Sequence, residues 1–204
     1  GYIGARYNGT GKVITAKECR AIKCEWNMAY QNREQVGSSF KPYILAEAVK
    51  QGMNVQTSTL DGYDNVYIPP DNEPTVYPSS TPGNGGHIVT NDDLGENGPY
   101  TPQMAMAASI NTAYADLWHV VAGVGSITKA NNIGTMAQLF GVDTDAAGIT
   151  GPDDFQDGYT VALGSASLSV IEQGSMLATI DDNGIYHDPH LITSISQSGA
   201  LTPI

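Results

Sequence analysis

The stretch VGSSFKPYILAEAV, Val36 to Val49, predicts the helix around which we expect this protein to fold. From Ser38 to Lys50 the sequence is nearly apolar apart from Glu47, and Gly52 follows where a helix C-terminal cap would fall. A helix that is apolar almost all round is a buried helix. The stretch therefore predicts a helix in the protein core.

Ser38 and Lys41 are three residues apart at the start of this helix. Side chains at this spacing lie on one helix face. Burial lowers the pKa of a lysine, so that the amine can take a serine proton. The N-terminus of the helix adds positive potential and free N–H groups that can stabilise an oxyanion. The pair is therefore sufficient for acyl transfer through a serine nucleophile.

A second Ser-x-x-Lys, SITK from Ser126 to Lys129, shows that this spacing alone is not specific. It is expected by chance about once in a chain of average composition and this size. Polar residues follow Lys129 in a predicted amphipathic helix, so we expect a solvated lysine there and Ser126 as a helix N-cap. Ser38 opens the buried helix, where a lysine with a perturbed pKa is expected, and we therefore choose Ser38.

SIN, from Ser109 to Asn111, could supply further polar groups, because it falls between two predicted helices. Such a site needs a second polar group to pass a proton to a leaving amine and to hold a substrate amide. YQN at 30–32 and YDN at 63–65 have a similar form, but neither lies between helices. We therefore favour SIN.

A long surface excursion is predicted from about Gln56 to Tyr100, because Asp, Asn, Pro, Gly, Ser and Thr dominate there. A loop of that length is usually functional or an insertion on a stable frame. Helices are expected to resume with Thr101 as an N-cap and Pro102 in the first turn. A later helix should begin with a capping box of Ser169 and Glu172.

The chain should end in a turn at Asn183-Gly184 and a strand through Leu191, Thr193 and Ile195. The order is a strand remnant, several helices and then a strand. It suggests an α+β fold with helices packed against an antiparallel sheet. We expect residues 1–204 to be the N-terminal and central part of a single domain.

Composition excludes some functions. Nine basic and twenty-one acidic residues give a formal charge of −12, which argues against a nucleic-acid partner. Cys19 and Cys24 lie five residues apart. This spacing has two interpretations: a loop closed by a disulfide, which we favour, or two unrelated buried thiols. HDPH, at 187–190, is typical of a surface turn rather than a metal site.

Three stretches in order resemble the penicillin-binding transpeptidases. QVGSSFKPYILAEAV is similar to the first motif of that family, and MAMAASINTAYADLW to the second, with SINTA nearest to the class A, high-molecular-weight members. ALGSASLSVIEQGSMLATIDDNGIYHDPHLI resembles the family's helix and following strand. The resemblance runs from about Asn27 to Ile195 and implies the serine β-lactamase/transpeptidase fold.

The resemblance implies roles for four residues. Ser38 would attack the D-Ala-D-Ala carbonyl of a peptidoglycan stem peptide, or a β-lactam ring, and its backbone N–H would form half of the oxyanion hole. Lys41 would be the base, Ser109 would relay protons with it, and Asn111 would hold the acyl side-chain amide. No metal or organic cofactor is implied. The domain would act outside the cytoplasmic membrane, anchored through a segment not present in this chain.

The family's third motif, Lys-Thr/Ser-Gly, does not occur before Ile204. We therefore expect a second chain, or a missing C-terminal segment, to carry it and to complete the site. D,D-carboxypeptidase and serine β-lactamase activity remain alternatives, as does a non-turnover β-lactam sensor. A secreted structural domain, with the three matches coincidental, is the remaining alternative.

Overall fold

The computed structural model describes residue 17 and residues 29–68, 87–93, 95–122, 127–149, 159–190, 194–197 and 200–203. In chain order the elements are β1 (Glu34–Gln35), the 3-10 helix η1 (Gly37–Phe40), α2 (Lys41–Lys50), β2 (Leu60–Asp61), β3 (Val66–Ile68), β4 (His87–Val89), β5 (Pro99–Tyr100), α3 (Pro102–Ala108), α4 (Asn111–Ala122), α5 (Ile127–Leu139), α6 (Thr144–Ala147), α7 (Tyr159–Ala162), β6 (Ser167–Leu168), α8 (Val170–Asp181), β7 (Ser194–Gln197) and β8 (Ala200–Pro203).

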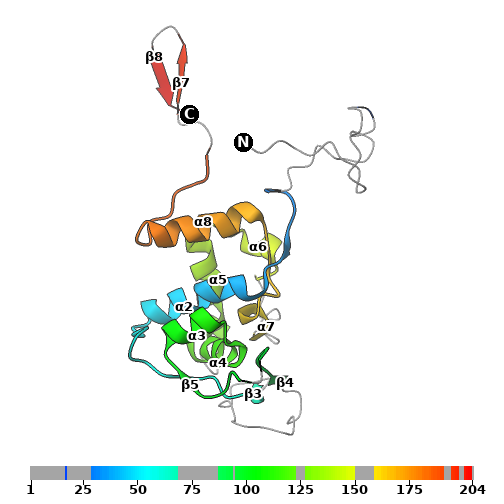
Figure 1. Ribbon diagram of the computed structural model, residues 1–204. Helices are drawn as coiled ribbons and strands as arrows, with labels where there is room; N and C mark the ends of the chain where they lie inside the picture. Colours follow the sequence, from blue (N-terminus) through cyan, green and yellow to red (C-terminus); the bar gives the residue numbers. More distant parts are fainter. Residues whose placement is uncertain are drawn as a thin grey trace.

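Helix α2 lies in the core, as its apolar sequence predicts. It packs against α4 and α5, and in Figure 1 it crosses the middle of the molecule between α8 and α3–α4. Phe40, Tyr43 and Ile44 are completely buried. Removing such a side chain would leave a cavity and cost about 2–5 kcal/mol. The predicted buried helix is therefore confirmed.

The first turn of this helix differs from the prediction, because it is a 3-10 turn over Gly37–Phe40. The backbone N–H of Lys41 donates to the Ser38 carbonyl, three residues back. In an α-helix that carbonyl would accept from Pro42, which has no N–H. The tighter 3-10 turn thus gives the Ser38 carbonyl a donor that the proline cannot supply.

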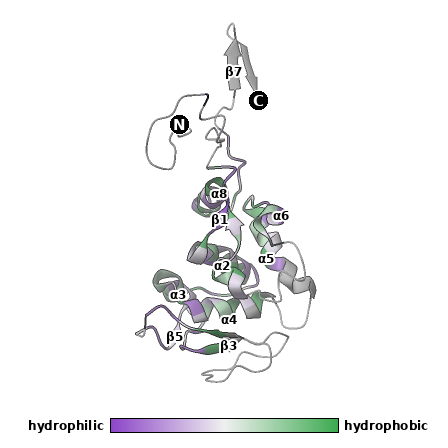
Figure 2. Cartoon of the chain, turned by 90° about the vertical axis from the view of Figure 1, so that its right-hand side faces the viewer, coloured by the Kyte–Doolittle hydropathy of each residue, from purple (hydrophilic) through white to green (hydrophobic). Residues whose placement is uncertain are grey.

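Strands β3 and β4 pack against α4, although they belong to the excursion predicted at 56–100. Val66 and Val89 form a small buried cluster with Ala115 of α4. In Figure 2, β3 carries hydrophobic colour beside α4. The excursion also contains β2 and β5, which pair with each other. The short strands of the excursion therefore pack on α3 and α4.

The described strands form four two-stranded antiparallel sheets, in the pairs β1–β6, β2–β5, β3–β4 and β7–β8. This agrees with an α+β fold with antiparallel pairing. The packing of the helices against one larger sheet stays a prediction. Positive φ angles at Asn183 and Gly184 mark the predicted turn there. Ile195 lies in β7, whereas Leu191 and Thr193 fall outside the described residues.

Both predicted helix starts are confirmed. The Thr101 side chain accepts from the Met104 N–H at 3.2 Å, with proline in the first turn of α3. Ser169 and Glu172 form the complete capping box of α8. Residues 1–16, 18–28 and 123–126 lie outside the described part of the chain, and with them Cys19, Cys24 and Ser126.

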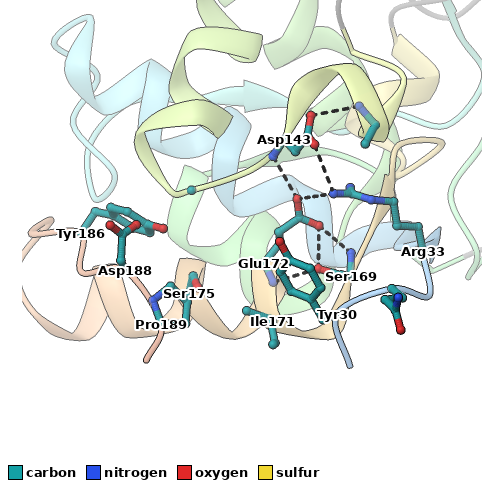
Figure 3. Close-up of a pocket in the computed structure, with 13 residues that line it drawn as sticks. Tyr30, Arg33, Asp143, Ser169, Ile171, Glu172, Ser175, Tyr186, Asp188 and Pro189 are labelled. Carbon is teal, nitrogen blue, oxygen red and sulfur yellow. Dashed lines mark hydrogen bonds and ion pairs between the residues drawn. The ribbon is translucent and has the colours of Figure 1, made fainter. Parts of the chain in front are cut away.

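Glu172 also joins three separate segments of the chain, which the sequence did not reveal. Its carboxylate accepts from the Arg33 guanidinium at 2.8 Å and from the Asp143 backbone N–H at 2.9 Å. Ser169 donates to it through both backbone N–H and hydroxyl at 2.7 Å (Figure 3). These hydrogen bonds hold the pKa of Glu172 below its ordinary value against the opposing effect of burial. The carboxylate thus ties α8 to the segment that leads into η1.

Candidate active site

Ser38 lies exposed in the 3-10 turn, and the backbone in front of it is held by a close contact with Gly164. The Gly37 N–H donates to the Gly164 carbonyl at 3.1 Å, and both glycines have positive φ angles, of 57° and 86°. A Cβ on Gly164 would overlap the Gly37 carbonyl. Only glycine permits the two backbones to come this close. The contact between Gly37 and Gly164 thereby fixes the position of the Ser38 backbone.

Lys41 is completely buried at the start of α2. Its Nζ donates to the Ser109 carbonyl at 2.6 Å, to the Ser109 Oγ at 2.9 Å and to the Asn111 Oδ1 at 2.8 Å. An ammonium group has three donors, and all three are engaged. The Tyr114 ring, 5.6 Å from Nζ, adds a cation–π contact. The second predicted motif is therefore brought directly onto the lysine of the first.

Burial lowers the pKa of Lys41 from 10.5 to about 8, because water no longer solvates the ammonium. The negative charges of Asp92 and Glu96 oppose this change. With a pKa near 8, about a tenth of the lysine is neutral at pH 7. Lys41 can therefore act as a base near neutral pH.

Ser109 and Asn111 sit at the junction of α3 and α4, as the sequence predicts. Ser109 is the C-cap of α3 and has a left-handed backbone with φ of 60°. Such a conformation is uncommon for a serine and costs of order 1 kcal/mol. Ile110, completely buried, anchors the junction, and α4 begins at Asn111. The sharp reversal of the chain lets both residues reach Lys41.

The 3-10 turn places Ser38 and Lys41 on one side of the chain. Residues three apart eclipse each other at three residues per turn, so both side chains project from one face. Among the described residues, the Ser38 hydroxyl makes no hydrogen bond, whereas its neighbour Ser39 donates to the Val36 carbonyl at 2.6 Å. The arrangement is an exposed serine hydroxyl three residues before a buried amine that two further polar residues hold in place.

The acidic groups near Lys41 were not predicted as part of the site. Asp92 Oδ1 accepts from Asn111 Nδ2 at 3.2 Å, and the charge of Glu96 also acts on the lysine. Both residues come from NDDLGENGP, in which the composition indicated only turns. The sequence alone could not place this segment near SIN, because its position depends on how the excursion packs against α4.

Other sequence candidates lie elsewhere. Lys129 belongs to α5, but its side chain is outside the described set, as is Ser126. His187 pairs with Asp182 at 2.8 Å on the surface.

Within the described ranges, no group of three or more His, Cys, Asp or Glu residues could hold a metal ion. In the same ranges, no helix is long and apolar enough to cross a bilayer.

A surface pocket lies over the Glu172 network and is drawn in Figure 3. Tyr30, Tyr186 and Asp188 are among its lining residues, together with Arg33. None of the four predicted site residues lines it. The pocket is therefore separate from the candidate active site.

Solved structures with a similar fold share little sequence with the chain. Penicillin-Binding Protein 1A from Haemophilus influenzae is 23% identical, with a TM-score of 0.63 over 89% of this chain and 23% of that chain. PBPA from Mycobacterium tuberculosis is 20% identical, with a TM-score of 0.62 over 93% and 44%. Penicillin-binding protein A from M. tuberculosis as a ceftriaxone acyl-enzyme complex is 22% identical, with a TM-score of 0.59 over 88% and 39%.

At these identities the structural likeness shows the fold alone. The chain spans less than half the length of the chain in each of these three structures. No curated protein matches the sequence. The family model described as penicillin binding protein transpeptidase domain, however, matches residues 8–203, nearly the whole chain. The chain therefore belongs to the penicillin-binding protein transpeptidase domain family.

Proposed function

We propose that this domain is a peptidoglycan D,D-transpeptidase that forms an acyl-enzyme at Ser38 and that β-lactams acylate the same serine. The observation that carries the proposal is the buried Lys41 amine, held by Ser109 and Asn111 one 3-10 turn from an exposed serine. M. tuberculosis penicillin-binding protein A, which has this fold, is known as a ceftriaxone acyl-enzyme. That chemistry supports a serine acyl-enzyme in this chain too.

In the proposed acylation, neutral Lys41 takes the Ser38 hydroxyl proton while the Ser38 oxygen attacks the carbonyl of the terminal D-Ala-D-Ala bond. The carbonyl oxygen becomes an oxyanion, and the Ser38 backbone N–H at the start of the helix is one donor to it. The C–N bond then breaks. The leaving D-alanine amine needs a proton, and the protonated Lys41 is its source.

Ser109 is suited to relay that proton because its hydroxyl can both donate and accept. The other two acceptors on Lys41, the Ser109 carbonyl and the Asn111 Oδ1, can only accept. When Lys41 is neutral, it has only two N–H groups and a lone pair. The Ser109 hydroxyl can then reverse its hydrogen bond and donate to the amine or to the leaving group.

Asn111 would hold the amide of the acyl group. In the structure its Nδ2 donates to Asp92, and a substrate carbonyl would replace that carboxylate as the acceptor. Its Oδ1 remains on Lys41. The amine of a second stem peptide then attacks the acyl-enzyme carbonyl and gives up a proton to neutral Lys41. The ester bond to Ser38 breaks, the Ser38 oxygen takes the proton back from Lys41, and the new amide bond is the cross-link.

The proposal includes partners outside these residues. A second chain or a C-terminal segment with a Lys-Thr/Ser-Gly motif would supply the other half of the oxyanion hole and the site for the substrate carboxylate. Peptidoglycan stem peptides are the substrates, and no cofactor takes part. The domain would work outside the cytoplasmic membrane, anchored by another segment.

The test is covalent labelling of the full natural chain with a fluorescent penicillin, followed by mass spectrometry of the labelled peptide. Ser38→Ala should abolish labelling. Ser39→Ala is the matched control, because Ser39 is the next residue and is also exposed, and it should keep labelling. Ser126→Ala should also keep it. No labelling of the natural chain, or labelling that survives Ser38→Ala, would contradict the proposal.

Release of the label separates the related functions. Loss within minutes would favour a β-lactamase, which needs a second base for deacylation. Loss over hours leaves a transpeptidase, a carboxypeptidase or a sensor. Incubation with a stem-peptide donor and an amine acceptor should then give the cross-linked product. Hydrolysis alone would favour a carboxypeptidase, and no turnover would favour a sensor.

A further inference from the structure

Helix α4 begins without a cap from its own sequence. Asn111 is its first residue, and Ile110 stands in front with a side chain that has no acceptor. The first N–H groups of a helix have no partner inside the helix, so they need one from elsewhere. This end of α4 carries Asn111, which binds Lys41. Whatever caps α4 therefore also determines where the second motif lies.

Asn91 supplies the cap from the excursion, 21 residues earlier in the chain. Its Oδ1 accepts from the Thr112 backbone N–H at 3.0 Å and from the Thr112 hydroxyl at 3.0 Å. Thr112 is completely buried, so water cannot replace these hydrogen bonds. A side chain in the usual N-cap role thus comes from a distant segment.

Asn91 is itself held on every polar atom of its side chain. Its Nδ2 donates to the Gly62 carbonyl at 3.0 Å and to the Glu96 carbonyl at 2.7 Å. Its backbone N–H donates to Asp64 Oδ1 at 2.9 Å. An amide is required here, because an aspartate could accept from Thr112 but could not donate to the two carbonyls.

The next residue continues the same contact. Asp92 accepts from Asn111, just as Asn91 accepts from Thr112. Two consecutive residues of the excursion therefore hold the first two residues of α4. Asn111 is fixed between Asp92 on one side and Lys41 on the other.

We propose that Asn91 is a positioning residue for acylation: by capping α4 from the excursion, it fixes Asn111 against Lys41. This inference rests on the proposed function for its catalytic consequence. It also gives the excursion a definite role at the site. The hydrogen bonds of Asn91 go to Thr112 and to other residues of the excursion, so Asn91 acts through Thr112 and Asn111.

The first experiment does not depend on activity. Amide hydrogen exchange, followed by NMR, would compare Thr112 in the natural chain, Asn91→Ala and Asn91→Asp. Asn91→Ala should expose the Thr112 N–H and speed its exchange by at least tenfold, whereas Asn91→Asp keeps an acceptor for Thr112, loses the two donors, and should speed the exchange less than Asn91→Ala does. Amides in the middle of α4, such as that of Leu117, should not change. Unchanged exchange of Thr112 in Asn91→Ala would overturn the proposal.

Asn54→Ala is the matched control for the loss of an asparagine cap. Asn54 Oδ1 accepts from the Gln56 and Thr57 backbone N–H groups at 2.9 and 3.1 Å, in an exposed turn. Its substitution should leave the exchange of Thr112 unchanged. Thr112→Val is a milder probe, because it removes only the hydroxyl contact and keeps the backbone one.

The second experiment measures the rate constant of acylation at saturating β-lactam. A misplacement of about 1 Å can cost a hundredfold in rate, so Asn91→Ala should slow acylation between about tenfold and a hundredfold. In an Asn111→Ala background the same change should cost about twofold or less, because the group that Asn91 positions is gone. Asn91→Asp should be slowed less than Asn91→Ala.

A purely structural role of Asn91 gives a different pattern. In Asn91→Ala the melting temperature would fall while the acylation rate constant of the folded protein stayed the same. Alternatively, Asn91→Ala would lower the acylation rate constant by the same factor in the natural chain and in Asn111→Ala. Either result overturns the proposal. If the natural chain is not acylated at all, the proposed function fails, and the exchange of Thr112 still decides whether Asn91 positions α4.

Discussion

Asp92→Asn is the change that most directly tests how the excursion acts on Lys41. The amide keeps an oxygen that can accept from Asn111 Nδ2, so the hydrogen bond at 3.2 Å can persist while the charge is lost. The negative charge of Asp92 stabilises the Lys41 ammonium and raises its pKa. Removing that charge should therefore lower the pKa of Lys41 below about 8.

The size of the effect follows from the chain of contacts between the two groups. Asp92 reaches Asn111 at 3.2 Å, and Asn111 reaches Lys41 at 2.8 Å. With the width of the amide added, the charges lie within about 8 Å of each other, which gives about 0.5 kcal/mol in water and about 2 kcal/mol at an effective dielectric of 20. Asp92 is exposed, so the lower value is nearer, and the pKa of Lys41 should fall by about 0.5.

The assay is the acylation rate of the full natural chain by a β-lactam between pH 6 and 9. The rate should rise with pH as Lys41 loses its proton, and the midpoint should move about 0.5 lower in Asp92→Asn. Below the midpoint the variant should therefore be up to about threefold faster. The difference should shrink at 1 M salt, because exposed charges are screened there.

Asp93→Asn is the matched control. Asp93 is also exposed, accepts from the Gly95 N–H at 3.0 Å and is not among the charges that act on Lys41. The midpoint of the pH dependence of acylation should be the same in Asp93→Asn as in the natural chain. A midpoint that stays fixed or moves upward in Asp92→Asn would refute the reasoning, because removing a nearby anion cannot stabilise an ammonium.

Two further changes test the frame around the site. Glu172→Gln should cost about 3 kcal/mol in the free energy of unfolding, measured by urea denaturation, because it removes the 2.8 Å ion pair of Arg33 and leaves only the longer contact with Asp143 at 4.0 Å. Folding lowers the pKa of Glu172, so its ionised carboxylate stabilises the protein above the ordinary pKa, and this stabilisation is lost as the pH falls through the lower pKa of the folded state. Between pH 5 and 3 the free energy of unfolding should therefore fall more in the natural chain than in Glu172→Gln. Gly164→Ala should slow acylation by at least tenfold, because the added Cβ overlaps the Gly37 carbonyl beside Ser38. Its control, Gly174→Ala in α8, meets nothing within 4 Å and should stabilise the protein by about 1 kcal/mol without slowing acylation; equal rates in both variants would contradict the role of the glycine pair.

Local signals in the sequence predicted much of the helical frame. The apolar run after Ser38 predicted a buried helix, and Thr101 and Ser169 predicted two helix starts that the structure contains. These signals work because each acts over a few residues, through periodicity or a cap. The position of SIN at a helix junction was predicted in the same way.

The parts that could not be predicted depend on contacts between distant segments. Asn91 and Thr112 are both polar, and neither reveals its partner in the sequence. Arg33 and Glu172 are 139 residues apart, so no local pattern joins them. The 3-10 turn at Ser38 could have been anticipated from Pro42, since a proline has no N–H to donate to the Ser38 carbonyl.

The register of β3 and β4 allows the excursion to be shortened without disturbing Asn91. Ile68 pairs with His87 and Val66 with Val89, so the chain leaves β3 and enters β4 at adjacent positions. Paired residues in antiparallel strands have Cα atoms about 5 Å apart, a gap that a two-residue Asn-Gly turn can close. Residues 69–86 can therefore be replaced by that turn while both strands are kept.

This replacement separates two roles for the excursion. If it acts by holding α4 through Asn91, as proposed, the acylation rate constant should stay within about twofold, because every contact to Thr112 is retained. If residues 69–86 shield the serine instead, their removal should speed acylation. A large loss of rate would show that the strands alone do not hold Asn91 in place. Combining the replacement with Asn91→Ala should then give the slow rate of Asn91→Ala alone, because the replacement leaves the contacts of residues 91 and 92 with α4 in place.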